Sequence, residues 1–276
     1  MKKLLFLLLF FNHVFCISPD HGNANAMSEN PKILGYNYFP EELSPYVSAS
    51  EFKQLTDHTF FCTHPRSGTN LTLEISCYLT RRPHYWNREN SSFWQKVTLH
   101  NRCMVDLDYE QFPFFCTHLV HETNQLSRRN QLITTLRNYK EIFFRGSSSF
   151  PSQHKMNTYF SYLKLFESWD SENRMMVKYE DLILRPFEVV KEIGDFLQVS
   201  EDRVDQLISE YDIFKENILN SYSNSPRTGK SYTRGKSLDF HRQKISPDVL
   251  KKVDEVMYRT NPYLFEKYLA HYREVE

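Results

Sequence analysis

Four apolar runs of β-type sequence alternate with segments of helical periodicity, and this alternation constrains the fold more than any other feature. The apolar runs cover residues 59–63, 112–117, 132–136 and 174–179. Helical patterns cover about 71–79, 139–147, 154–170, 186–197 and the residues from 201 onward, and Ser246-Pro247 opens another helix. This order predicts an α/β fold, with a central parallel sheet flanked by helices on both faces. Residues 84–110 are polar and aromatic, and we expect loops with short helices there.

The charge balance excludes a globally basic nucleic-acid binder. The 276 residues carry 34 Lys+Arg against 34 Asp+Glu, so the formal net charge is zero. A nucleic-acid partner is therefore not expected. With 40% hydrophobic and 25% charged residues, the chain has ordinary globular composition, which argues against disorder as a whole.

The N-terminus has the pattern of an export signal. Met1-Lys2-Lys3 precedes an apolar run that is too short to span a bilayer comfortably. We expect a leader over residues 1–26, then one domain over 27–276, with export or transient membrane contact through the leader. A buried N-terminal helix is the alternative. Cys62 and Cys116 lie in apolar runs and are expected to be small buried residues.

The segment from His64 to Asn70 joins the first apolar run to the first helix. In an open parallel sheet, ligands bind beyond the carboxyl ends of the strands. Gly68 permits a turn without a Cβ clash, and the N–H groups after it lie at a helix N-terminus, where the dipole favours an anion. Arg66 adds a fixed positive charge. Further polar groups come from Ser67, Thr69 and Asn70. The segment predicts an anion site; an ordinary strand–helix turn is the alternative.

A nucleotide kinase or NTPase is the natural rival interpretation. Such a protein needs the motif G-x-x-x-x-G-K-[S/T]. Residues 227–231 carry only the end of that motif, because Asn224 stands at the first glycine position and no strand precedes it.

The segment His64-Pro65-Arg66-Ser67-Gly68-Thr69-Asn70 resembles the 5′-phosphosulfate loop of sulfotransferases, whose usual form is P-K/R-S/x-G-T. These enzymes use 3′-phosphoadenosine 5′-phosphosulfate (PAPS) as sulfuryl donor. Further segments match in the expected order, over roughly residues 58–250. The resemblance implies the P-loop NTPase-like sulfotransferase fold, donor binding at this loop, and no required metal.

Residues 133–141 resemble the family's strand followed by R-N-x-K-D, in which the arginine binds the donor's 3′-phosphate. Arg137 occupies that position, and an i,i+4 salt bridge with Glu141 is the alternative role. Arg145 stands where the family usually has serine. The resemblance leaves open whether Arg145 contacts the phosphate instead.

Three more positions are implied to bind the donor. A segment resembling Y-E-D-L-x-x-x-P begins at Tyr179, whose counterpart lies near the adenine. Residues 232–240 resemble the C-terminal R-K-G-x-x-G-D-W loop over the 3′-phosphate, with Arg234 and Gly235 at matching positions and departures elsewhere. Phe214 is the candidate aromatic wall of the adenine, with core packing as the alternative.

Thr117-His118-Leu119 resembles the end of the family's K-T-H-L segment, in which the histidine is the base. An acceptor hydroxyl needs a general base that titrates near neutrality, and histidine supplies one. His118 is therefore the candidate base and His121 the alternative; a packing role for His118 is also open. Cys116 replaces the lysine that helps to stabilise the leaving group, so Arg66 is a candidate for that task.

The resemblance implies a PAPS-dependent sulfotransferase that acts on a hydroxyl or amine acceptor, either a small molecule or a carbohydrate. A P-loop phosphotransferase or kinase and a non-catalytic nucleotide-binding relative remain as alternatives. The acceptor and the oligomeric state do not follow from the sequence. Because PAPS is made in the cytoplasm, a cytoplasmic location is the alternative to export.

Overall fold

The structure is a computed structural model that describes residues 56–82, 84–87, 97–99, 107–108, 114–145, 148–223, 238 and 240–274. The expected leader and the donor-binding candidates Arg234 and Gly235 lie outside these residues. Within the described ranges, no helix is both long enough and apolar enough to cross a membrane.

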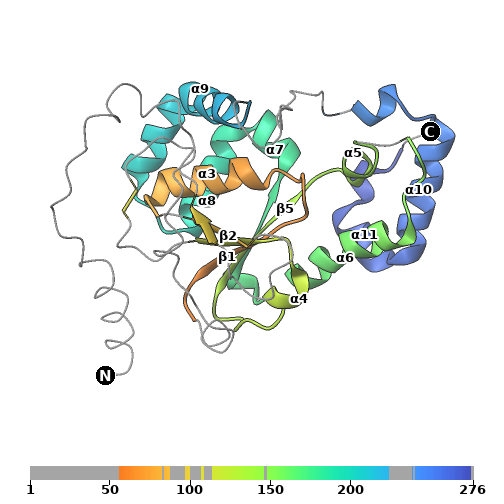
Figure 1. Cartoon of the computed structure of the whole chain (residues 1–276), viewed down its shortest axis with the longest axis horizontal. Coiled ribbons are helices and arrows are strands. Elements are labelled where there is room, and N and C mark those ends of the chain that lie inside the picture. Colours follow the sequence, from red (N-terminus) through yellow and green to blue (C-terminus); the bar gives the residue numbers. More distant parts are fainter. Residues whose placement is uncertain are drawn as a thin grey trace, which may run out of the picture.

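A sheet forms the centre of the described fold, with helices packed around it (Figure 1). It has six strands in the order β3-β2-β4-β1-β5-β6. The strands are β1 Thr59–Cys62, β2 His84–Asn87, β3 Val97–Leu99, β4 Phe114–Thr117, β5 Gln131–Leu136 and β6 Arg174–Lys178. All neighbours pair in parallel except β2 and β3, which pair antiparallel. The four strands expected from the apolar runs are confirmed as β1, β4, β5 and β6.

The expectation of loops with short helices over residues 84–110 is wrong at two places, where β2 and β3 form. β2 has the sequence HYWN, which lacks a clear alternation of apolar and polar residues. It is a strand because it pairs in parallel with β4, so that His84 lies opposite Phe114 and Trp86 opposite Cys116. Strand formation depends strongly on such cross-strand neighbours, which the local sequence does not reveal.

The described helices are α3 Thr69–Thr80, α4 Val120–Thr123, α5 Tyr139–Phe143, α6 Gln153–Glu167, α7 Tyr179–Leu184, α8 Pro186–Phe196, α9 Glu201–Ser223, α10 Pro247–Thr260 and α11 Pro262–Tyr268. Six of them, α3, α5, α6, α8, α9 and α10, correspond to the helical patterns in the sequence, whereas α4, α7 and α11 were not expected as separate helices. Short 3₁₀ turns are η3 Ser171–Asn173, η4 Phe240–Gln243 and η5 Ala270–Tyr272. Proline begins α8 and α10, where its missing N–H costs no helical hydrogen bond.

Helices cover both faces of the sheet, as the alternation of elements predicts. The helices α3, α8 and α9 lie on one face of the sheet, and α4 and α6 on the other (Figure 1). Side chains alternate along β1, so Phe61 packs in the apolar cluster of the first face and Phe60 and Cys62 in that of the second. A third apolar cluster joins the end of β5 to α5, α6, α10 and α11. The α/β fold with a mainly parallel sheet is confirmed.

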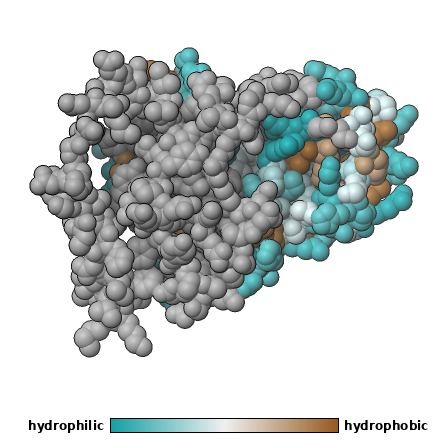
Figure 2. Space-filling model, in the orientation of Figure 1, coloured by the Kyte–Doolittle hydropathy of each residue, from teal (hydrophilic) through white to brown (hydrophobic). Residues whose placement is uncertain are grey.

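The surface over the C-terminal helices is mostly hydrophilic, with small apolar areas between the polar side chains (Figure 2). Among the described residues, the exposed large hydrophobic side chains come from different segments rather than from one element. They are Phe150, Leu184, Phe187, Ile213, Tyr258 and Tyr263.

Candidate functional site

The loop between β1 and α3 is held in shape by short polar contacts. The backbone N–H and the hydroxyl of Ser67 both donate to the carbonyl of His64, at 3.2 and 2.5 Å. The buried Ser67 hydroxyl also bonds to that of Thr135 on β5, and the hydroxyls of Thr63 and Thr69 lie 2.7 Å apart. The Ser67 side chain therefore supports the loop from within, and the loop is preorganised before any ligand binds.

Gly68 is required at its position by both conformation and space. Its φ angle is +105°, a conformation that side chains strongly disfavour. A Cβ atom there would lie only 2.8 Å from Cδ2 of Tyr179. Gly68 is also the N-cap of α3, and as a glycine it has no side chain to cap the helix. The first turn of α3 contains no acidic residue. The positive end of the helix dipole is therefore available to an anion, with Thr69 buried and Asn70 half-buried in that first turn.

Three arginines from separate segments converge at this loop. Arg66 is exposed on the loop, and Nη1 of Arg137, at the end of β5, donates to its carbonyl at 3.3 Å. The pKa of Arg145 is lowered, first by burial and then by repulsion from the guanidinium groups of Arg137 and Arg66. Since that repulsion requires proximity, the structure brings the three cations together. Their mutual repulsion makes the cluster favourable for an anionic ligand.

Arg137 is oriented by neighbours but keeps an unused donor. Only 7% of the residue is exposed, and its guanidinium lies 4.1 Å from the centre of the Tyr179 ring. The salt bridge to Glu141 that the sequence left open is present, with a separation of 3.8 Å. Among the residues that the structure describes, no atom accepts a hydrogen bond from its buried Nε. A buried donor without a partner is costly, so this group is suited to a ligand.

Tyr179 links the loop between β1 and α3 to the two strands beside it. It is the first residue of α7, directly after β6, and its half-buried ring contacts Gly68 on one side and Arg137 on the other. The next residue, Glu180, accepts a hydrogen bond from the backbone N–H of Asn138 at 2.9 Å. The Y-E-D segment thus holds the end of β5, and with it Arg137, beside the loop.

His118 lies at the end of β4, next to the end of β1. Its Nδ1 is 2.6 Å from the carbonyl of Thr63, and only an Nδ1–H can donate to that oxygen. This tautomer carries the basic lone pair on Nε2. The hydroxyl of Tyr162 donates to the His118 carbonyl at 2.6 Å, which fixes the backbone as well. The imidazole is therefore fixed in orientation, with its Nδ1–H bound to the Thr63 carbonyl.

His64 is a site residue that the sequence interpretation missed. Its ring lies against Tyr159 and Tyr162, and its Nδ1–H donates to the carbonyl of Pro65 at 2.8 Å. Burial lowers its pKa to about 4, with further repulsion from His118 and Arg66. The position of His64 directly after β1 was the one sequence feature that could have marked it as a site residue. The tyrosines that bury its ring lie on α6, far away in the sequence.

The remaining candidates lie elsewhere. His121 is exposed on α4, and Cys116 is fully buried in β4, where burial raises the pKa of its thiol. Cys116 therefore offers no charge to a leaving group. Phe214 is 3% exposed and lies in the core, with its ring edge-on to Tyr78 at 5.4 Å. That placement is the core-packing alternative left open by the sequence. Within the described ranges, no three His, Cys, Asp or Glu residues gather in a metal-holding arrangement.

Comparison with known proteins identifies the family. The sulfotransferase domain matches residues 56–267, which is most of the chain. The chain therefore belongs to the sulfotransferase domain family of enzymes, and the resemblance inferred from its sequence is confirmed. It is 24% identical over 207 residues to 3-beta-hydroxysteroid sulfotransferase of Cavia porcellus, covering 62% of this chain and 70% of that one.

Two solved structures are also similar. One is a mouse sulfotransferase complexed with PAP, with 12% identity and a TM-score of 0.45, covering 82% of this chain and 94% of that one. The other is retinol dehydratase in a complex with retinol and PAP, with 13% identity and a TM-score of 0.43, covering 83% and 86% of the two chains.

Proposed function

We propose that this sulfotransferase takes its sulfuryl group from PAPS and transfers it to a hydroxyl or amine of a small molecule or carbohydrate. The observation that carries the proposal is the contact between Arg66 and Arg137 at one preorganised loop before the N-terminus of α3. Repulsion from both guanidinium groups contributes to the lowered pKa of Arg145, which supports a third cation nearby. A donor with phosphate and sulfate groups is the ligand class that such a site suits. Arg234 and Gly235 remain predicted donor contacts, as does Tyr179 beside the adenine.

In the proposed reaction, Nε2 of His118 accepts the proton of the acceptor hydroxyl while that oxygen attacks the sulfur. The bond between sulfur and the 5′-phosphate oxygen breaks, and its electron pair leaves with adenosine 3′,5′-bisphosphate. Arg66 and the N–H groups at the start of α3 stabilise the charge on the leaving phosphate. Catalysis of this kind rests on positioning and electrostatic stabilisation, as in phosphoryl transfer.

A non-catalytic binding role is the second candidate, and the buried Cys116 favours it. The family's lysine at that position helps the leaving group, whereas the Cys116 side chain is neutral and fully buried. In the proposed enzyme, Arg66 compensates for this loss. A phosphotransferase would instead require ATP and Mg²⁺.

Calorimetry with adenosine 3′,5′-bisphosphate tests the donor site. We expect binding by the full chain and roughly 10- to 100-fold weaker binding by Arg137→Ala, because hydrogen bonds to charged groups contribute about 1.5–3 kcal/mol. Arg185→Ala is the matched control, since Arg185 is exposed and forms a surface ion pair with Asp181 at 3.1 Å. No binding, or tighter binding of ATP, would contradict the proposal.

Release of adenosine 3′,5′-bisphosphate from PAPS, measured with a panel of phenols, hydroxysteroids and oligosaccharides, tests transfer. His118→Ala should lower turnover by roughly 10²- to 10⁴-fold while leaving bisphosphate affinity unchanged. Unchanged turnover would exclude His118 as the base. Binding without turnover in the wild-type chain would support the non-catalytic role.

The compartment is a separate proposal. We infer export or membrane association through the leader at residues 1–26, with a cytoplasmic location as the alternative. Mass spectrometry of the mature N-terminus tests for export, because an exported chain should lose the leader. If the leader is intact, fractionation into membrane and soluble material separates membrane association from a cytoplasmic location.

A further inference from the structure

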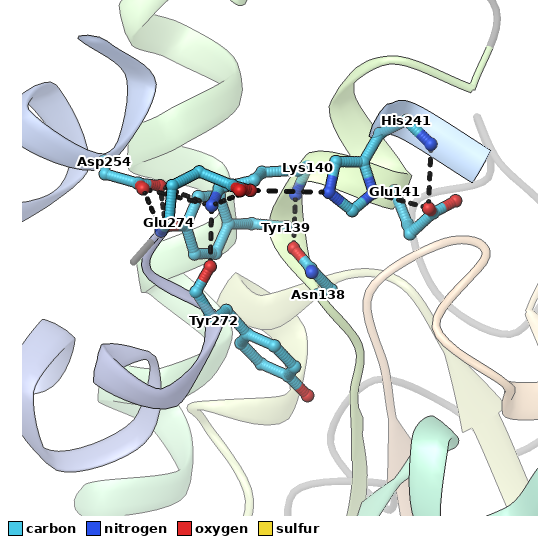
Figure 3. Close-up of polar contacts among 8 residues, drawn as sticks. All are labelled: Asn138, Tyr139, Lys140, Glu141, His241, Asp254, Tyr272 and Glu274. Atoms are coloured by element: carbon cyan, nitrogen blue, oxygen red, sulfur yellow. Dashed lines mark hydrogen bonds and ion pairs between the residues drawn. The ribbon is translucent and has the colours of Figure 1, made fainter. Parts of the chain in front are cut away.

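Glu141 lies between two partners at the edge of the candidate site and is bound unequally by them. Its Oε1 accepts hydrogen bonds from the backbone N–H of His241 at 3.0 Å and from His241 Nδ1–H at 2.5 Å (Figure 3). Its Oε2 lies 3.8 Å from Nη2 of Arg137, at the outer limit of an ion pair. The carboxylate is therefore held by His241 and only loosely paired with the arginine.

The surroundings of Glu141 keep it dry and in place. Glu141 is 4% exposed and His241 1% exposed. The preceding residue, Lys140, is fully buried, and its Nζ contacts Asp254, Glu274 and the carbonyl of Tyr272 at 2.6–3.0 Å (Figure 3). Because these contacts anchor α5 from the other side, Glu141 can change partner only by a side-chain movement.

A buried carboxylate is costly unless it is paired. If Glu141 loses its hydrogen bonds to His241, pairing with Arg137 becomes more favourable for it. Arg137 is the other partner of Glu141, and it is also the residue with an unpartnered Nε within the described residues. A carboxylate that closes fully on Arg137 would compete with a phosphate for the same guanidinium, since arginine binds both groups in the same bidentate way.

We propose that His241 is a positioning residue that restrains Glu141 and so keeps Arg137 available to the donor's 3′-phosphate. The inference rests on the proposed function, in which Arg137 binds that phosphate. Neither Glu141 nor His241 touches the reacting atoms. Their effect passes through the orientation and hydrogen-bonding capacity of Arg137.

The test compares two ligands that differ only in the 3′-phosphate, adenosine 3′,5′-bisphosphate and adenosine 5′-phosphate, by calorimetry. In His241→Ala, we expect affinity for the bisphosphate to fall roughly 5- to 30-fold, which lies within the range of coupling between contacting residues. Affinity for the monophosphate should stay within about twofold, because only the Arg137 contact is affected. His241→Asn keeps a side-chain N–H donor and should retain most of the bisphosphate affinity.

Glu141→Gln tests whether Glu141 causes the loss of bisphosphate affinity in His241→Ala. A neutral glutamine does not compete for Arg137, so Glu141→Gln should bind the bisphosphate at least as well as the wild type. The double variant His241→Ala/Glu141→Gln should recover the affinity that His241→Ala loses. Leu207→Ala in α9 is the stability control, because it creates a cavity in the core cluster that contains α9 rather than the one that contains α5.

The outcomes separate this inference from the proposed function. If the wild-type chain does not bind the bisphosphate, the proposed function fails. If it binds and His241→Ala weakens both ligands equally, as Leu207→Ala should, His241 is merely structural and the inference is overturned. If the double variant remains as weak as His241→Ala, Glu141 is not the mediator and the inference is equally overturned.

Discussion

Two histidines at neighbouring strand ends have different electrostatic settings. His118 is oriented by the Thr63 carbonyl, whereas His64 is enclosed by tyrosines from α6 and has a pKa lowered to about 4. A neutral His64 adds no charge beside the three arginines. His64 thus contributes shape and a fixed hydrogen bond to the loop, while its burial makes the fold sensitive to acid.

The depressed pKa of His64 predicts an acid-dependent loss of stability. Between pH 6.5 and 4 the unfolded chain binds a proton that the folded chain does not, so the free energy of unfolding falls as pH is lowered. The contribution of His64 is of the order of 2–3 kcal/mol. Urea unfolding at pH 7.5 and 4.5 should show a smaller difference in His64→Gln than in the wild type.

His58 should supply a second part of this dependence, since burial also lowers its pKa to about 4. His64→Gln should therefore reduce the pH dependence without abolishing it. An identical dependence in His64→Gln and the wild type would contradict the assigned burial effect.

At the scale of elements, the site exists where β1, β4, β5 and β6 end and where α3 and α7 begin. α3 presents an N-terminus without acidic residues in its first turn, and α7 presents Tyr179 across the loop. Gly68, the N-cap of α3, lies so close to Tyr179 that a Cβ there would be 2.8 Å from Cδ2 of the ring. A side chain at this position would disturb both the loop and the contact between Tyr179 and Arg137.

Gly68→Ala should lower the free energy of unfolding and weaken bisphosphate binding. The φ angle of +105° alone costs roughly 1–3 kcal/mol for a residue with a Cβ. The contact with Tyr179 Cδ2 at 2.8 Å adds to that cost. Urea denaturation and calorimetry measure the two effects.

Tyr179→Ala is the matched background for this measurement. It removes the steric contribution to the stability cost of Gly68→Ala but leaves the cost of the positive φ angle. Gly68→Ala should therefore cost less stability there than in the wild type, though still a measurable amount. If Gly68→Ala lowers the free energy of unfolding equally in both backgrounds, the close approach to Tyr179 does not contribute to that loss.

At the scale of the whole molecule, Lys140 on α5 connects the end of β5 to the C-terminal helices. Its Nζ pairs with Asp254 of α10 and with Glu274, and the Tyr139 hydroxyl also bonds to Asp254 (Figure 3). These contacts join segments more than 100 residues apart in the chain. The C-terminal helices are thereby fixed to the same short helix, α5, that follows Arg137.

Lys140→Met should lower the free energy of unfolding by about 3–5 kcal/mol, because it leaves two carboxylates without their cation. Urea denaturation measures the loss. The control Glu255→Ala removes an exposed i,i+4 pair with Arg259 and should cost less than about 1 kcal/mol. A similar small cost for both variants would contradict the role assigned to the buried lysine.

Local sequence was sufficient for the elements that carry strong patterns of their own. The apolar runs that became β1, β4, β5 and β6 have β-type composition, and Pro186 and Pro247 mark helix starts. The sequence failed at β2, whose four residues lack a clear alternation of apolar and polar residues and depend on pairing with β4. Phe214 was ambiguous for a similar reason, since an aromatic residue suits a core and a ligand wall equally.

The sequence by itself determined the fold class and the family, and it predicted the loop between β1 and α3 as the candidate anion site, because these depend on the order of apolar runs and on short motifs. Only the tertiary structure decided which charges meet. Arg66, Arg137 and Arg145 converge, and Glu141 meets His241 from 100 residues away, because the parallel strands end at one edge and the C-terminal segment returns to it. Such contacts depend on distances in space, and no local pattern in the chain encodes them.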